Sequence, residues 1–184
     1  MSIIKFFAVT FFNIIDKFIH QKKILKFLKK NLNNLNVFFD IGSHKGTYTD
    51  LVVKNFKTKK VFMFEPQKKI FNFIKNKYKD KKKFKIFNKA VSNTESIQSI
   101  YLNKHDLTSS LTKLNKKNSY LSYKAFLFGS TADKMITKTQ KIKTIKLKNI
   151  ISKNNLKKID LIKIDTEGHE LQVILGIGKY IKNV

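Results

Sequence analysis

The chain has 184 residues, of which 42% are hydrophobic and 12% aromatic, so it can bury the core of one domain and wholesale disorder is excluded. It contains no cysteine, which excludes disulfides, thiolate metal sites and cysteine nucleophiles and suits a reducing compartment. The net charge of +27 suggests a polyanionic partner, but all 39 basic residues are lysine, and the guanidinium fork that reads phosphate and guanine is absent. We therefore favour a solvated lysine surface over a nucleic acid or other polyanionic partner.

Residues 1–35 are predicted to form an N-terminal amphipathic helical segment. The segment from Ile3 to Leu28 is apolar, but Lys5, Asn13 and Asp16 interrupt its longest candidate span. Six of its apolar residues fall on one helical stripe: Phe7, Phe11, Ile14, Ile15, Phe18 and Ile19. The stripe falls short of the roughly 20 apolar residues that a spanning helix needs, and no secretory cleavage site follows it. Two interpretations stay open: a helix packed on the domain or over its pocket, and a basic helix resting on a membrane surface. We expect a cytoplasmic protein, peripheral to the membrane in the second case.

Residues 36–184 are predicted to form one doubly wound α/β domain with a mostly parallel, Rossmann-like sheet. Short apolar runs alternate with amphipathic helical patterns, which implies parallel strands joined by right-handed crossovers. In chain order, the first predicted elements are the strand 37–41, the helix 47–56, the strand 60–64, the helix 68–78 and the strand 84–88.

The pattern changes between residues 90 and 151. Residues 99–102 and 142–147 are predicted as short strands, and the polar segment between them as an insertion that serves as a lid or substrate loop. A buried strand, 159–164, and a helix, 171–181, follow. Doubly wound domains usually continue with further strands, so we expect a sheet that lacks its C-terminal strands, through truncation or a reduced fold.

The turn Asp40-Ile41-Gly42-Ser43-His44-Lys45-Gly46 follows the first strand. It lacks the G-x-G-x-x-G spacing of dinucleotide-binding turns, and its entrance carboxylate disfavours a phosphate. An acid there suits a cationic ligand such as the sulfonium and ammonium of S-adenosylmethionine, and Gly42 lets the backbone approach that ligand. Glu65, at the end of the next strand, is placed to accept both ribose hydroxyls. The alternative is that Asp40 only caps the turn and Glu65 is merely exposed.

Four motifs follow predicted strands: Asp40-Ile41-Gly42, Phe64-Glu65-Pro66, Asn88-Lys89-Ala90-Val91-Ser92 and Lys163-Ile164-Asp165-Thr166-Glu167-Gly168-His169-Glu170. Together with Leu175-Gly176, they resemble the FkbM-like family of S-adenosylmethionine-dependent methyltransferases over residues 36–178. Ser109-Ser110-Leu111 is similar to the serine-rich loop of that family. The resemblance implies O-methylation of a hydroxyl on a sugar or polyketide-like acceptor. The chain departs from the family pattern at Lys148-Asn149, where the family carries an acidic pair.

Transfer of a methyl group to a hydroxyl gains from holding the acceptor in place and from a positioned base. Asp165, at the end of the last predicted strand, is the first candidate for that base, with Glu167 and His169 as alternatives. A divalent ion on these acids is a competing interpretation, but we predict no metal site. Glu167 and Glu170 also suit the positive end of the following helix. Lys163 is predicted to be a structural partner of a nearby carboxylate.

The leading hypothesis from the sequence is a methyltransferase whose cofactor is S-adenosylmethionine and whose acceptor is a hydroxyl-bearing small molecule or glycan. One alternative is a non-catalytic remnant that binds a ligand or partner, and another is an RNA methyltransferase, which only the charge suggests. The predicted cofactor-binding residues are Asp40, Gly42, Ser43, Gly46, Glu65, Pro66 and Ala90.

Overall fold

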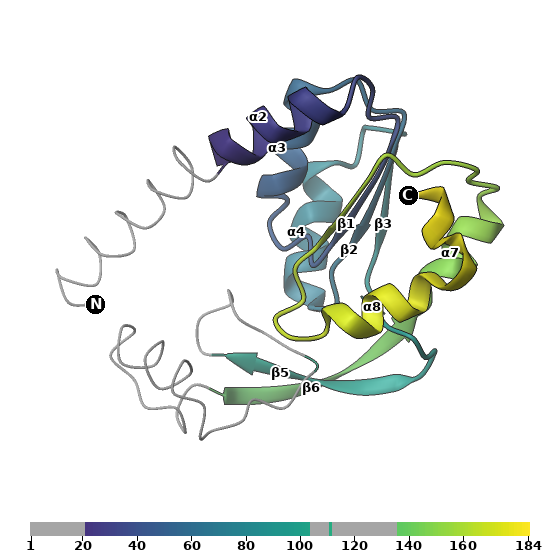
Figure 1. Cartoon of the computed structure of the whole chain (residues 1–184). Coiled ribbons are helices and arrows are strands. Elements are labelled where there is room, and N and C mark those ends of the chain that lie inside the picture. Colours follow the sequence, from purple (N-terminus) through teal and green to yellow (C-terminus); the bar gives the residue numbers. More distant parts are fainter. Residues whose placement is uncertain (1–20, 104–110, 112–135) are drawn as a thin grey trace, which may run out of the picture.

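The computed structural model describes residues 21–103, 111 and 136–184 (Figure 1). The predictions for residues 1–20 of the N-terminal segment, and for most of the insertion including Ser109 and Ser110, lie outside the described residues.

Four parallel strands form the central sheet in the order β3-β2-β1-β7. Their bounds are Val37–Ile41 (β1), Lys60–Phe64 (β2), Phe84–Phe87 (β3) and Leu161–Ile164 (β7). The helices α3 (Thr47–Asn55) and α4 (Lys68–Lys77) lie in the crossovers from β1 to β2 and from β2 to β3. The predicted doubly wound, mostly parallel sheet is thus confirmed, with the last strand beside the first.

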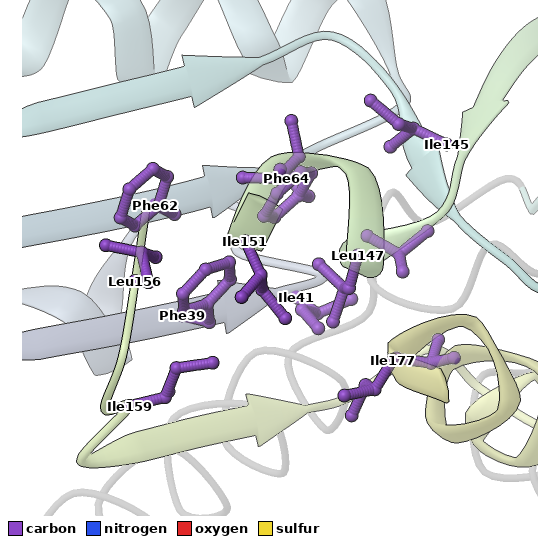
Figure 2. Close-up of a cluster of buried hydrophobic side chains, with 13 residues drawn as sticks. Phe39, Ile41, Phe62, Phe64, Ile145, Leu147, Ile151, Leu156, Ile159 and Ile177 are labelled. Carbon is purple, nitrogen blue, oxygen red and sulfur yellow. The ribbon is translucent and has the colours of Figure 1, made fainter. Parts of the chain in front are cut away.

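Helices cover both faces of this sheet, which explains why β1 and β2 are apolar on both sides. In β1, Phe39 and Ile41 face α7 and α8, while Phe38 faces the layer that contains α3 and α4. Figure 2 shows the first of these layers, in which Phe39, Phe62 and Phe64 lie between the sheet and the helices. Phe39 and Phe62 stack with their ring centroids 4.6 Å apart. Burying each of these rings stabilises the fold by about 2–3 kcal/mol.

A second, smaller sheet has the order β4-β6-β5. It contains β4 (Ala90–Val91), β5 (Ile97–Asn103) and β6 (Ile136–Ile145). β4 and β6 are parallel, and β5 and β6 antiparallel. Both strands predicted in this region exist, but they are longer than the sequence indicated.

The helix α7 (Leu147–Lys153) corrects the prediction that the second short strand reaches residue 147. Alternating apolar residues continue to Leu147, but Leu147, Ile150 and Ile151 are buried at helical spacing. The carboxylate of Glu95 accepts hydrogen bonds from the Lys146 backbone N–H at 3.4 Å and from the Asn149 side chain at 2.7 Å. A distant residue therefore supplies an acid beside the start of this helix, where the chain departs from the family pattern.

The C-terminal helix prediction is correct as far as residue 177. α8 (Glu170–Ile177) ends at Gly178, whose φ of 59° breaks the helical path, and a 3-10 helix, η2 (Gly178–Asn183), follows. Gly176 packs so closely on β4 that a Cβ there would lie 2.3 Å from the Ser92 carbonyl oxygen.

The N-terminal helix α2 (Gln21–Asn31) lies against α3 (Figure 1). Its Leu28 is 5% exposed, so the described part of the segment packs on the domain. Within the described ranges, no helix has the length and apolar character required to cross a membrane.

Candidate functional site

A cavity of about 660 Å³, counting the part open to solvent, lies at the carboxyl ends of the central strands. β1 is connected forward to β2 on one side and pairs with the distant β7 on the other, so the strand order reverses at this point. Open α/β sheets bind ligands where the order reverses in this way. The lining residues are Gly42, His44, Phe64, Glu65, Pro66, Gln67, Lys89, Ala90, Val91, Ile100, Leu111, Asp165, Thr166, Glu167 and His169.

Gly42 joins the two turns that border the cavity. Its φ is +74°, and a Cβ on it would lie 1.9 Å from the carbonyl oxygen of Asp165. The backbone N–H groups of Gly42 and Ser43 both donate to the Phe64 carbonyl at 3.1 Å. Only glycine therefore allows the turn after β1 to contact the turn after β7 this closely.

Ser43 and Gly46 shape the first turn from outside the cavity lining. The Ser43 hydroxyl donates to the Phe64 carbonyl at 3.2 Å. Gly46 has a φ of +75°, and the Tyr78 hydroxyl lies 3.1 Å from its carbonyl oxygen and 2.7 Å from the Asp50 carboxylate. A Cβ on Gly46 would lie 2.5 Å from that hydroxyl. The turn is thus fixed against α4 by a buried tyrosine.

Asp40 is fully buried and lies behind the cavity wall. Its carboxylate accepts a hydrogen bond from Thr49 at 2.6 Å and lies 3.3 Å from the ammonium of Lys163. Burial raises the pKa of Asp40, and the Lys163 charge opposes that rise. The contact expected between Asp40 and a cationic ligand is replaced in this structure by an ion pair with the chain's own lysine.

Lys163 holds three parts of the site together. Its ammonium donates to the Gly42 carbonyl at 2.8 Å and lies 3.3 Å from Asp40 and 3.5 Å from Asp165. These contacts confirm the prediction that Lys163 is a structural partner of nearby carboxylates. They follow from the register, because Lys163 pairs with Asp40 across β7 and β1.

Glu65 is 3% exposed and faces the cavity, so it is not the merely exposed residue of the alternative interpretation. One carboxylate oxygen accepts from the His44 N–H at 3.0 Å and the other from the Gln67 N–H at 2.9 Å. Burial raises the pKa of Glu65 to about 7, although these two amides act in the opposite direction. A carboxylate oxygen has two lone pairs, so each retains one for a ligand hydroxyl.

The turn after β7 brings Asp165, Glu167 and His169 to one wall of the cavity, as the sequence predicted. The Asp165 side chain is 65% exposed, and Glu167 is exposed with a φ of +53°. α8 begins at Glu170, so Glu167 precedes the helix instead of lying in its first turn.

Glu170 fixes the shape of this turn. Its carboxylate accepts hydrogen bonds from the Thr166 N–H, the Thr166 hydroxyl and the Gly168 N–H at 3.0–3.1 Å. Burial acts to raise the pKa of Glu170, but these hydrogen bonds outweigh it and lower the pKa. Glu170 lies in the first turn of α8, as expected, while these contacts are made to the turn before the helix.

His169 lies beside Ser92, with the Nε2 atom 3.1 Å from the serine hydroxyl. Burial lowers the pKa of His169, although Glu170 opposes the change, and the imidazole is therefore neutral at pH 7. Pro66 and Ala90, which are predicted to bind the cofactor, line the cavity. Eight further lining residues are not among the predicted site residues: His44, Phe64, Gln67, Lys89, Val91, Ile100, Leu111 and Thr166. The alternation of apolar and polar residues around Ile100 predicts that its side chain is buried. The local sequence does not show that this buried side of the strand faces the cavity.

The charged side chains of the lining are mostly acidic. Asp165 and Glu167 contribute carboxylates, Glu65 contributes a carboxyl group whose pKa of about 7 leaves it partly charged at neutral pH, and Lys89 contributes one ammonium. The chain as a whole has a net charge of +27. In the part of the chain that the structure describes, no group of three or more acidic or histidine side chains has the geometry to hold a metal ion. The electrostatics favour a ligand that carries positive charge where it meets these acids.

One family model matches most of the chain. The sequence profile of the methyltransferase FkbM domain matches residues 40–184. Among solved structures, the chain is similar to the methyltransferase FkbM from Methylobacillus flagellatus KT, with 16% sequence identity and a TM-score of 0.47. The similarity covers 77% of this chain and 28% of that chain, so this chain spans little more than a quarter of that relative. No curated protein matches the chain.

Proposed function

The chain belongs to the methyltransferase FkbM family, and from this premise we propose that it binds S-adenosylmethionine in the cavity and O-methylates a sugar, glycan or other small acceptor. One observation carries the proposal. The cavity at the reversal of strand order is lined by the acidic side chains of Glu65, Asp165 and Glu167, although lysine dominates the rest of the chain. S-adenosylmethionine carries a sulfonium and an ammonium, so this lining suits it better than it suits a nucleotide phosphate.

The residues present fit this cofactor. Glu65 keeps one lone pair on each carboxylate oxygen for ribose hydroxyls, and Gly42 leaves the backbone of the first turn accessible. Pro66 and Ala90, together with Phe64, supply an apolar wall suited to a purine ring. Asp40, Ser43 and Gly46 support the turn from behind.

When bound, the cofactor supplies a methyl group on sulfonium sulfur: an oxygen–carbon bond forms, the sulfur–carbon bond breaks, and the acceptor hydroxyl loses its proton. We assign that proton to the Asp165 carboxylate, which borders the cavity and is oriented by Lys163 at 3.5 Å. His169 is the second candidate, because its neutral imidazole can accept a proton and Ser92 orients it. Glu167 is a third, at the exposed rim.

An RNA acceptor is a weaker proposal, because phosphates would meet the acidic wall formed by Asp165 and Glu167. A non-catalytic remnant differs from an enzyme in a measurable way, since it binds the cofactor without transferring its methyl group.

Titration calorimetry with S-adenosylmethionine tests the cofactor assignment. We expect the wild-type chain to bind and Glu65→Ala to bind at least tenfold more weakly, because a hydrogen bond to a charged group contributes about 1.5–3 kcal/mol. Asp80→Ala is the matched control, since Asp80 is an exposed acid outside the cavity lining. A folded wild-type sample that does not bind, or equal affinities in all three proteins, contradicts the assignment.

Transfer of a labelled methyl group to pools of glycans, hydroxylated small molecules and RNA tests the reaction. We expect label in a hydroxyl of the first or second pool, and a larger loss in turnover than in cofactor affinity for Asp165→Asn. Label in RNA alone would replace the proposed acceptor. Equal losses in turnover and affinity would remove Asp165 from the role of base.

A further inference from the structure

The amino ends of the central strands carry a group of exposed lysines, here named the basic edge. It lies at the opposite edge of the sheet from the cavity and is independent of the proposed function. Its members come from the loops before β2, β3 and β7 and from the first residue of β2: Lys57, Lys59, Lys60, Lys79, Lys81, Lys82, Lys157 and Lys158. Two acids lie among them, the exposed Asp80 and Asp160, whose side chain is only 5% exposed.

Backbone hydrogen bonds hold these loops side by side. The N–H groups of Lys59 and Lys60 donate to the Asn36 carbonyl at 2.9 and 2.8 Å. The Val61 N–H donates to the Lys83 carbonyl at 2.9 Å, and the Asp160 N–H to the Val37 carbonyl at 3.0 Å. The loops that carry the lysines therefore lie next to one another at this edge of the sheet, and the lysine charges add over one surface.

The helix α2 runs along the same end of the molecule (Figure 1). It ends at Asn31, and residues 32–36 lead directly into β1. Its lysines are all exposed and it contains no acid: Lys22, Lys23, Lys26, Lys29 and Lys30.

Two apolar side chains of α2 face solvent. Phe27 is 65% exposed and Ile24 is 38% exposed, whereas the neighbouring Leu28 is buried. An exposed aromatic ring between lysines on an amphipathic helix is typical of helices that lie in the boundary between headgroups and acyl chains.

We propose that the basic edge and α2 form a docking surface for an anionic phospholipid bilayer. The lysines neutralise lipid headgroups, and Phe27 and Ile24 enter the boundary below them. Lysine supplies positive charge without the base-reading geometry of arginine, and exposed apolar side chains gain nothing from a phosphate backbone, so a bilayer fits better than nucleic acid. The cavity, at the other edge of the sheet, faces away from the bound surface.

Co-sedimentation with lipid vesicles tests this surface. We expect the full chain to bind vesicles of phosphatidylcholine mixed with phosphatidylglycerol, to release them as salt rises, and to ignore pure phosphatidylcholine. Equal binding to both vesicles, or binding to neither, overturns the proposal. Asp165→Asn should bind vesicles like the wild type, so the outcome does not depend on the proposed methyl transfer.

Two variants of equal charge separate a defined surface from net charge alone. Changing Lys57, Lys59, Lys81 and Lys82 to Gln should weaken binding by tenfold or more, because each lysine near an anionic membrane changes partitioning about fivefold. The control replaces four exposed lysines of other elements by Gln: Lys69, Lys141, Lys143 and Lys148. A loss in the control equal to that in the edge variant overturns the proposal.

Phe27→Ser separates a bilayer from nucleic acid, since it removes an apolar contact without changing the charge. We expect several-fold weaker vesicle binding by this variant. RNA that competes with vesicles at the same salt concentration, together with unchanged vesicle binding by Phe27→Ser, would identify the surface as a nucleic acid site and overturn the bilayer.

Discussion

The two edges of the central sheet differ in charge and in how that charge is held. The carboxyl edge gathers five of the chain's 12 acidic residues: Asp40, Glu65, Asp165, Glu167 and Glu170. The amino edge gathers exposed lysines. Most of these acids have defined partners, such as Lys163 for Asp40 and two backbone amides for Glu65. The lysines of the amino edge are exposed, and one of them, Lys158, lies 3.4 Å from Asp160.

The difference has a physical cause. A buried carboxylate is costly without hydrogen bonds or a counter-charge, whereas an exposed lysine requires neither. The fold therefore positions the acids at the carboxyl edge. Replacing the partner of one acid changes the hydrogen bonds and charge interactions of the residues next to it. At the amino edge, the summed positive charge of several lysines matters more than the position of any one of them.

The largest effect is expected for Gly42→Ala. The new Cβ would lie 1.9 Å from the Asp165 carbonyl oxygen, and φ is +74°. Overpacking and left-handed strain together predict a loss of about 4 kcal/mol in the free energy of unfolding, measured by denaturant titration. Gly168→Ala is the control, because φ is +96° but nothing lies within 4 Å of its Cβ, so about 1–2 kcal/mol is expected. Equal losses in the two variants would contradict a close contact between the turns.

Lys163→Met is expected to cost about 3 kcal/mol at neutral pH, because it leaves the fully buried Asp40 without its counter-charge. Asp40 should then take up a proton, so the loss in unfolding free energy shrinks as the pH falls. The double variant Asp40→Asn with Lys163→Met should lose less than the sum of the single losses in a double-mutant cycle. Additive losses would show that the two residues do not interact.

Glu65 gives the carboxyl edge a pH dependence of its own. Its pKa is about 7 in the fold against 4.5 for an ordinary glutamate, so the folded state holds a proton that the unfolded chain has released. The resulting stabilisation is complete below pH 4.5, falls as the pH rises to 7, and is on the order of 2–3 kcal/mol. The free energy of unfolding of Glu65→Gln should not show this decrease when it is measured from pH 4.5 to 7.5. A wild-type profile parallel to that of the variant would contradict the raised pKa.

Glu170 should behave in the opposite direction and more weakly. Burial acts to raise its pKa, but hydrogen bonds from its own backbone N–H, from Gly168 and from Thr166 outweigh burial and lower the pKa below 4.5. Its contribution is therefore present above that pH and is lost as the pH falls. Because the carboxylate is partly solvated, we expect Glu170→Gln to lose only about 0.5–1 kcal/mol at pH 7. Thermal unfolding of the wild type and of Glu170→Gln at pH 7 and pH 3 measures this loss of stability. A difference between the two proteins that grows towards pH 3 would contradict the lowered pKa.

Much of the carboxyl edge could be predicted because local patterns determine it. Asp40-Ile41-Gly42, Phe64-Glu65-Pro66 and the segment from Lys163 to Glu170 each follow an apolar run, and parallel strands bring their ends to one edge. The helix α7 was missed because its apolar residues continue the alternation of the strand before it, and a seven-residue helix offers little periodicity. Its acidic partner, Glu95, is distant in the sequence and carries no local signal.

The sequence by itself determined the doubly wound class, the order of strands and turns, and the acids that border the cavity, since apolar periodicity and glycine turns are local properties. Only the tertiary structure decided what each acid does. Asp40 lies near the end of β1 and Glu65 directly follows β2, yet Asp40 faces Lys163 behind the wall and Glu65 faces the cavity. Partners more than a hundred residues apart, such as Gly42 and Lys163, meet only because β7 pairs with β1.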